Sequence, residues 1–172
     1  YLLKAIPLVE RMDRKEDYVV ITGNIGEIYS DKKDHKKALE YFEKSIKAAG
    51  NSISSAFAIN GIGKVYLNEG KLIEALQFHN KALDIATKFD DKIQVARSMR
   101  GIADVYIKQN KTALAIDYYN RARMIVEELD DLKIEVKDLY HDMAFAYSKS
   151  KNYSNAFLYQ SLYANIKDTL YD

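Results

Sequence analysis

The residue types that most often carry out chemistry are sparse in this chain of 172 residues. It contains three histidines, His35, His79 and His141, and no cysteine, which excludes disulfides, thiolate metal sites and cysteine nucleophiles. None of the histidines has a partner at the spacing of a metal-ligand set. We therefore expect no metal site, no cofactor and no catalytic residue in this segment.

Other chemical signatures are also weak. The run Gly61-Ile62-Gly63 falls inside an expected helix and lacks the rest of a nucleotide-binding fingerprint. No nucleophile can be paired with a base from the sequence. Lysine plus arginine is 26 and aspartate plus glutamate is 25, whereas a nucleic-acid-binding domain usually has a basic excess. No apolar run approaches the length of a membrane span. We expect neither an enzyme nor a nucleic-acid-binding or membrane-inserted segment, and the compartment stays open between cytoplasm and periplasm.

One short pattern occurs four times and sets the position of every helix. A small residue is followed by a tyrosine three residues later, and then by an alanine nine residues after the tyrosine. The four copies are Gly26/Tyr29/Ala38, Gly63/Tyr66/Ala75, Ala103/Tyr106/Ala115 and Ala144/Tyr147/Ala156. A repeat of this length is typical of stacked helical hairpins, because one hairpin cannot cover its own apolar face. We expect each small residue to face the alanine of its copy where two helices approach closely.

Apolar residues at i, i+3, i+4 and i+7 divide each copy into a first and a second amphipathic helix. We expect helix pairs over 16–31 and 35–49, 54–69 and 72–89, 92–109 and 112–129, and 132–150 and 154–170. Residues 1–13 match the second helix of a truncated repeat, and the full repeats cover 16–50, 52–89, 91–129 and 131–171 in one array. Gly50 is expected to end a helix, and Asn51-Ser52 and the aspartates at 90–91 and 130–131 to cap the helices that follow.

The pattern resembles the tetratricopeptide repeat, because a further aromatic and small residue follow in the first three copies. These pairs are Phe42 and Ser45, His79 and Ala82, and Tyr119 and Ala122. The usual turn proline is missing, the period exceeds 34 residues, and the last copy has Gln160 and Tyr163 instead. The longer period is similar to repeats of kinesin light chains, Leu-Gly-Asn-type spindle adaptors and Rap-type bacterial regulators. The resemblance implies an all-α right-handed superhelix whose first helices line a concave groove.

In this repeat frame, three positions of each first helix face the groove. They are Val20, Gly23 and Glu27; Phe57, Asn60 and Lys64; Arg97, Arg100 and Asp104; and Asp138, His141 and Phe145. The candidate peptide-binding residues are Asn60, Lys64, Arg97, Arg100, Asp104 and His141. Arginine makes bidentate contacts with carboxylates, so these residues could hold a carboxylate or the backbone of an extended peptide. The alternative is that they are solvated side chains, with Asp104 and Asp138 neutralising the arginines. Under the first interpretation, charge reversal at Arg97 and Arg100 weakens partner binding without lowering the melting temperature.

Two histidines and most tyrosines have simpler interpretations. His79 takes the aromatic position of its repeat and is expected to pack, whereas His35 at a turn is expected to be solvated. The tyrosines of the pattern are expected to pack in the core. The last repeat keeps Phe157 and Leu158 where a terminal repeat should have a polar outer face. We therefore expect something to pack there: a further helix, a second copy or the rest of a parent protein.

These features predict a protein-interaction module that binds a peptide or protein segment. Residues 159–171 are similar to the last repeat before the membrane helix in bacterial sensory proteins, which implies the sensory or regulatory region of a larger signalling protein. The chain begins in mid-pattern without methionine, which also favours a fragment of a longer protein. The alternative is an architectural or dimerisation array attached to a signalling enzyme, such as a histidine kinase or a nucleotide cyclase.

Overall fold

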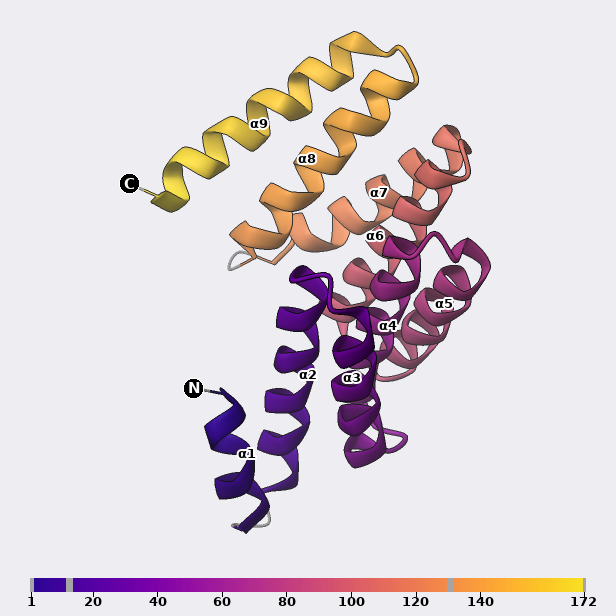
Figure 1. The fold of residues 1–172 in the computed structure, drawn as a ribbon. Helices are drawn as coiled ribbons and strands as arrows, with labels where there is room; N and C mark the ends of the chain where they lie inside the picture. Colours follow the sequence, from indigo (N-terminus) through magenta and orange to yellow (C-terminus); the bar gives the residue numbers. More distant parts are fainter. Residues whose placement is uncertain (1, 12–13, 130–131, 172) are drawn as a thin grey trace.

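The computed structural model describes residues 2–11, 14–129 and 132–171, which form nine α-helices and no strand (Figure 1). The helices are α1 (Leu2–Arg11), α2 (Lys15–Asp31), α3 (His35–Ala49), α4 (Ser55–Asn68), α5 (Leu72–Lys88), α6 (Lys92–Lys108), α7 (Thr112–Glu127), α8 (Lys133–Lys149) and α9 (Tyr153–Tyr171). From α2 onward they pair as hairpins that stack side by side in chain order (Figure 1). The predicted all-α superhelical array is confirmed.

The expected helices are all present, with small differences at their ends. The largest difference is at α7, which ends at Glu127 and not at Leu129. Asp91 caps α6 as predicted, because its carboxylate accepts a hydrogen bond from the backbone N–H of Gln94 at 3.0 Å. The aspartates at 130–131 lie outside the described residues. Hydrophobic periodicity therefore located the helices, as it should where one face of each helix is buried.

The connection from α3 to α4 is predicted only in part. Gly50 ends α3 in the left-handed region, with φ at 63°, as expected of a C-terminal glycine. The N-cap expected at Asn51-Ser52 is wrong, because the Ser52 hydroxyl donates to the carbonyl of Ala49 at 2.9 Å and α4 begins only at Ser55. The Ser52 hydroxyl therefore satisfies a carbonyl at the end of α3 and does not cap α4.

The turn inside each hairpin has the same backbone geometry in all four repeats. The fourth residue after each repeat tyrosine lies in the left-handed region: Lys33 (φ 59°), Gly70 (φ 77°), Asn110 (φ 59°) and Lys151 (φ 63°). The N–H of the residue after it donates to the carbonyl of that tyrosine at 2.9 Å in each hairpin. This bond satisfies a carbonyl at the helix end and turns the chain back on itself. Only one of the four positions is a glycine, so three hairpins carry the strain of a side chain at positive φ.

Phe42 of α3 fills the space between two first helices. Its side chain is 1% exposed, and a methyl group at Gly26 in α2 would lie 2.7 Å from the ring. A methyl group at Gly61 in α4 would lie only 2.3 Å from the same ring. Gly26, the small residue of the first copy, therefore faces Phe42, which lies one turn after Ala38. Ala38 itself is fully buried. One ring between two glycines lets α2, α3 and α4 approach closely.

His79 repeats this arrangement in the next hairpin, which confirms its predicted packing role. It is 2% exposed, and methyl groups at Gly63 and Gly101 would lie 2.7 Å and 2.4 Å from the imidazole. The third hairpin departs from the arrangement. Tyr119 takes the ring position at 2% exposure, but the residue of α8 that corresponds to Gly61 and Gly101 is Asp142.

The repeat tyrosines are half-buried and pair with an aromatic residue of the second helix. The pairs, with distances between ring centroids, are Tyr29–Tyr41 (5.6 Å), Tyr66–Phe78 (5.3 Å), Tyr106–Tyr118 (5.6 Å) and Tyr147–Tyr159 (5.4 Å). Such pairs add to the hydrophobic contact between the two helices of a hairpin. Their predicted packing role is confirmed, at the contact within each hairpin.

Candidate functional site

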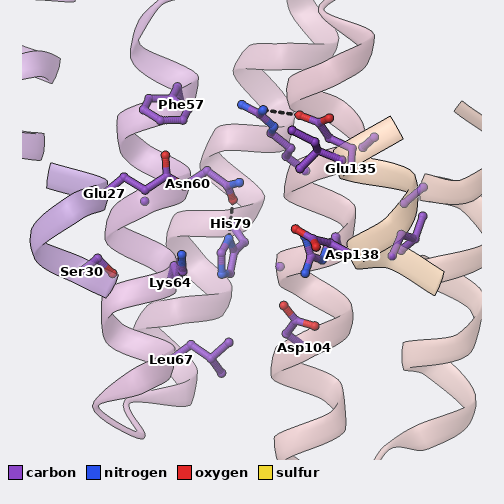
Figure 2. A pocket seen from close by; sticks show the side chains of 18 of the residues that line it. Glu27, Ser30, Phe57, Asn60, Lys64, Leu67, His79, Asp104, Glu135 and Asp138 are labelled. Carbon is purple, nitrogen blue, oxygen red and sulfur yellow. Dashed lines mark hydrogen bonds and ion pairs between the residues drawn. The ribbon is translucent and has the colours of Figure 1, made fainter. Parts of the chain in front are cut away.

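The inner faces of α2, α4, α6 and α8 line a groove with a volume of about 560 Å³ (Figure 2). Phe42, His79, Ala122 and Val126 from the second helices also line it. Its apolar lining includes Phe57, Leu67 and Ile134, and Ile134 is 60% exposed. The expectation that the first helices line a concave groove is met.

The structure brings five of the six candidate residues together in this groove: Asn60, Lys64, Arg97, Arg100 and Asp104. The sixth, His141, is not among the lining residues. Its ring packs against Tyr163 of α9, with 5.3 Å between centroids, and its Nδ1 lies 3.3 Å from Asp142. The candidate set remains a prediction, now with His141 placed apart from the others.

The polar and apolar lining residues that were not predicted from the sequence include Ser30, Leu67, His79 and Glu135. Ser30 and Leu67 extend the expected stripes of α2 and α4 by one turn, and Glu135 extends the stripe of α8 in the other direction. A stripe drawn over more turns would have included these three. His79 comes from a second helix, so only the packing geometry shows that it reaches the groove.

Arg97 is held on two sides. Its guanidinium donates to Glu135 of α8 at 2.5 Å, and it lies over the ring of Phe57 at 5.8 Å from the centroid. A guanidinium that stacks on an aromatic ring and pairs with a carboxylate has a fixed orientation. Arg97 therefore joins the walls formed by α4, α6 and α8.

Arg100 sits among carboxylates. Its Nε donates to Asp142 at 2.6 Å, and its Nη1 lies 3.6 Å from Asp138. Burial lowers the pKa of Arg100, but Asp142, Asp104 and Asp138 raise it by more, so the net shift is upward. Arg100 is therefore a fixed cation whose Nε and Nη1 already face carboxylates.

Asp104 lies at the base of the same cluster. The hydroxyl of Tyr119 donates to its carboxylate at 2.5 Å. Burial, with the charge of Asp142 added, raises the pKa of Asp104 to about 7, although Arg100 and the Tyr119 hydroxyl act in the opposite direction. Burial and the neighbouring Asp104 also raise the pKa of Tyr119, which keeps that hydroxyl a donor.

These pairs change the expected behaviour of the arginines. Glu135 pairs with Arg97, and Asp142 pairs with Arg100. The Asp104 and Asp138 expected from sequence also act on Arg100. Charge reversal at Arg100 would place a fourth carboxylate beside three others. We therefore expect such a variant to lower the melting temperature, so it cannot serve as a clean test of binding.

Asn60 and His79 form the opposite part of the groove. The Nδ1–H of His79 donates to the Oδ1 of Asn60 at 2.5 Å, which leaves Nε2 as the bare nitrogen. Burial lowers the pKa of His79 to about 4, so the imidazole is neutral at neutral pH. Within the described residues, neither His79 Nε2 nor the hydroxyl of Ser30 has a hydrogen-bond partner, and both residues are 2% exposed.

The other histidine prediction is wrong. His35 is not solvated, because its side chain is only 23% exposed and its Nδ1 lies 3.3 Å from Glu69 at the end of α4. The first residue of α3 is therefore covered by the next hairpin, which the sequence pattern of a single repeat does not show.

The described residues hold neither a metal-binding cluster nor a membrane-spanning helix. They contain no group of three or more histidine or carboxylate residues that could hold a metal ion. None of their helices has the length and hydropathy needed to cross a membrane.

Comparison with known proteins gives consistent results. Two family models, both described as tetratricopeptide repeat, match residues 54–128 and 23–52, which together make up more than half of the chain. No curated protein sequence matches the chain significantly.

Solved structures share the fold. Aspartyl phosphate phosphatase F from Bacillus subtilis is 16% identical with a TM-score of 0.77, over 92% of this chain and 42% of that one. BtubC (BKLC) from P. vanneervenii is 16% identical with a TM-score of 0.72, over 88% of this chain and 64% of that one. The N-terminal domain of stress-induced protein-1 (STI-1) from C. elegans is 25% identical with a TM-score of 0.52, over 74% of this chain and 95% of that one.

The chain spans less than two thirds of the first two of these proteins, and similarities at 16% identity establish the fold alone. The family models establish the family as well as the fold, since the residues they match include three of the four copies of the pattern. The chain belongs to the tetratricopeptide repeat family, whose members generally serve as scaffolds for protein interaction.

Proposed function

We propose that the chain binds a peptide or an extended protein segment in its concave groove. The observation that carries this proposal is the pair of buried polar atoms without partners, His79 Nε2 and Ser30 Oγ, in the lining of one open groove. A buried polar group without a hydrogen bond costs about 1–3 kcal/mol. A peptide offers donors and acceptors at every residue and could satisfy both atoms.

The side chain of Asn60 supports a peptide ligand. Its oxygen is engaged by His79, so its amide N–H groups are the part left to meet a ligand. An amide donor is suited to a backbone carbonyl, and the apolar Phe57 and Leu67 of the same helix can contact side chains of the segment. Neither the hydrogen bond from Asn60 nor these apolar contacts require a particular peptide sequence.

Selection from a random peptide display library tests the proposal. We expect peptides that are enriched on the wild-type chain to bind the Asn60→Ala and Leu67→Ala variants at least about tenfold more weakly, the loss of one hydrogen bond or one apolar contact to a ligand. Ile73→Ala is a matched control, since Ile73 of α5 is 71% exposed and is not a lining residue. Absence of enriched peptides, or equal binding to all variants, would contradict the proposal.

We further propose that the chain is the sensory or regulatory region of a larger signalling protein. Its similarity to an aspartyl phosphate phosphatase, of which it spans only 42%, supports this. In the full-length protein, Leu67→Ala is then expected to change the response of the output activity to the partner. An unaltered response, at full loss of peptide binding, would argue against a regulatory role.

A second candidate function is self-association through the last hairpin. On α9, Tyr153 is 68% exposed, Phe157 75% and Leu158 48%. Such neighbouring apolar side chains favour a dimerisation or docking surface. Sedimentation equilibrium would show a mass that rises with concentration and falls to that of a monomer in Phe157→Glu. A monomer at every concentration would exclude this candidate.

A further inference from the structure

The wall of the groove formed by α6 and α8 holds more carboxylates than cations. Asp138 and Asp142 both contact Arg100, at 3.6 Å and 2.6 Å, and Asp104 acts on the same guanidinium electrostatically. Lys137 also pairs with Asp138 at 3.4 Å, so two cations serve these three carboxylates. Arg97 of the same wall is paired with Glu135.

The rest of the groove does not correct this imbalance. The charged residues that line the whole groove are three cations and four acidic residues. The cations are Lys64, Arg97 and Arg100, and the acidic residues are Glu27, Asp104, Glu135 and Asp138. Lys64 pairs with Asp31 at 2.9 Å, and Glu27 forms no ion pair with the described residues. An anionic ligand would thus meet more carboxylates than cations, and guanidinium groups that already pair with carboxylates.

The buried polar atoms of the floor point to the same kind of ligand. Because His79 uses its Nδ1–H to bond Asn60, its Nε2 carries a lone pair and can only accept a hydrogen bond. A ligand group that meets this nitrogen must therefore supply a hydrogen-bond donor. Figure 2 shows Asp104 and Asp138 on one side of the groove and His79, Lys64 and Leu67 on the other.

We propose that the groove recognises a positively charged segment of its partner, with a lysine or arginine side chain seated against Asp104 and Asp138. This inference rests on the proposed function and names its ligand class. Asp138 is 41% exposed and so can receive a ligand directly, whereas Asp104 is more enclosed. Ammonium and guanidinium groups carry only donors, which match these acceptors.

Sequencing the peptides from the display selection tests the proposal. We expect enrichment of lysine or arginine at one fixed position. For one synthetic peptide from the pool, the Asp138→Asn variant should raise the Kd about tenfold or more, because a charge-assisted hydrogen bond is lost. Replacing the selected lysine with methionine should weaken binding to the wild-type chain but hardly to Asp138→Asn, so the two changes are not additive.

Asp117→Asn is the matched control, because Asp117 of α7 is 65% exposed in its side chain, pairs with Arg121 and is not a lining residue. Asp104→Asn is a second test variant for the case that Asp138→Asn does not fold. Enrichment of acidic or uncharged peptides would overturn the proposal and leave peptide binding intact. Absence of any peptide sensitive to Leu67→Ala would overturn both.

Discussion

The Nδ1–H of His79 donates to the Oδ1 of Asn60 across 2.5 Å, and this bond ties a ring packed between hairpins to a side chain of the groove wall. One residue thus has two tasks. Its ring fills the gap between Gly63 and Gly101, and its nitrogen orients the Asn60 amide.

The His79→Phe variant separates these tasks. Phe42 occupies the same position between two glycines, so a phenyl ring should fit and the melting temperature should stay within a few degrees of the wild type. The Asn60 amide loses its donor, and we expect selected peptides to bind several-fold more weakly by calorimetry. Wild-type affinity in this variant would show that the orientation of Asn60 does not matter for binding.

The same variant changes the pH dependence of stability. The pKa of His79 is about 4 in the folded chain against 6.5 for an unperturbed histidine, so the unfolded state takes up the proton first. This contribution to stability is complete above about pH 6.5 and is lost as the pH falls toward about 4. Urea unfolding at several pH values should show a smaller acid loss in His79→Phe. An identical profile in both proteins would mean that the imidazole does not stay neutral when buried.

Asp104 has the opposite effect to His79 on how stability depends on pH. Its pKa is about 7 in the folded chain against 3.8 for an ordinary aspartate, so the folded state keeps the proton longer than the unfolded state. Stability from this group falls as the pH rises from about 4 to about 7. Asp104→Asn should therefore raise the melting temperature more at pH values above 7 than below 5, measured by circular dichroism. A larger gain in acid would contradict the raised pKa.

Gly101→Ala should destabilise the stack between the second and third hairpins. The added methyl group would lie 2.4 Å from the imidazole of His79, and such overpacking costs about 1–3 kcal/mol. The double variant with His79→Ala gives the methyl group room, so the two losses of unfolding free energy should sum to more than the loss in the double variant. Simple additivity in urea titrations would show that the ring and Gly101 are not in contact.

The hairpin turns give a test of backbone strain. Lys151 and Gly70 hold the same turn position, with φ at 63° and 77°. Lys151→Gly should stabilise the last hairpin slightly, whereas Gly70→Ala should lower the unfolding free energy by about 1 kcal/mol because alanine resists positive φ. A methyl group at Gly70 meets no atom within 4 Å, so any loss would come from the backbone and not from a clash.

The sequence predicted the helices through their local periodicity, and the groove through its resemblance to the tetratricopeptide repeat. A residue three or four positions from a groove residue shares its face, so Asn60 and Lys64 were found together with Arg97 and Arg100. The spacing between neighbouring hairpins does not follow from periodicity. That spacing brings Arg97 of α6 into contact with Glu135 of α8, which lies 38 residues away in the sequence.

The positions of two histidines differ from expectation for the same reason. His35 is covered by Glu69 of the next hairpin, and His141 packs against Tyr163, a residue that departs from the repeat pattern. In each case the residue that the histidine contacts comes from another helix. The stacking of the hairpins or helices determines which residue that is. Patterns within one helix carry no information on that contact.

The replacement of glycine by Asp142 has a consequence for the mechanics of the array. At the first two joints, rings inserted between glycines hold α2, α4 and α6 by dispersion forces, which respond little to dissolved salt. Between α6 and α8, Arg97 and Arg100 add Coulombic pairs, which weaken as ionic strength rises, to the apolar packing of α8. The fourth hairpin is therefore expected to respond more to salt than the first three, so that the curvature of the superhelix there changes with the salt concentration.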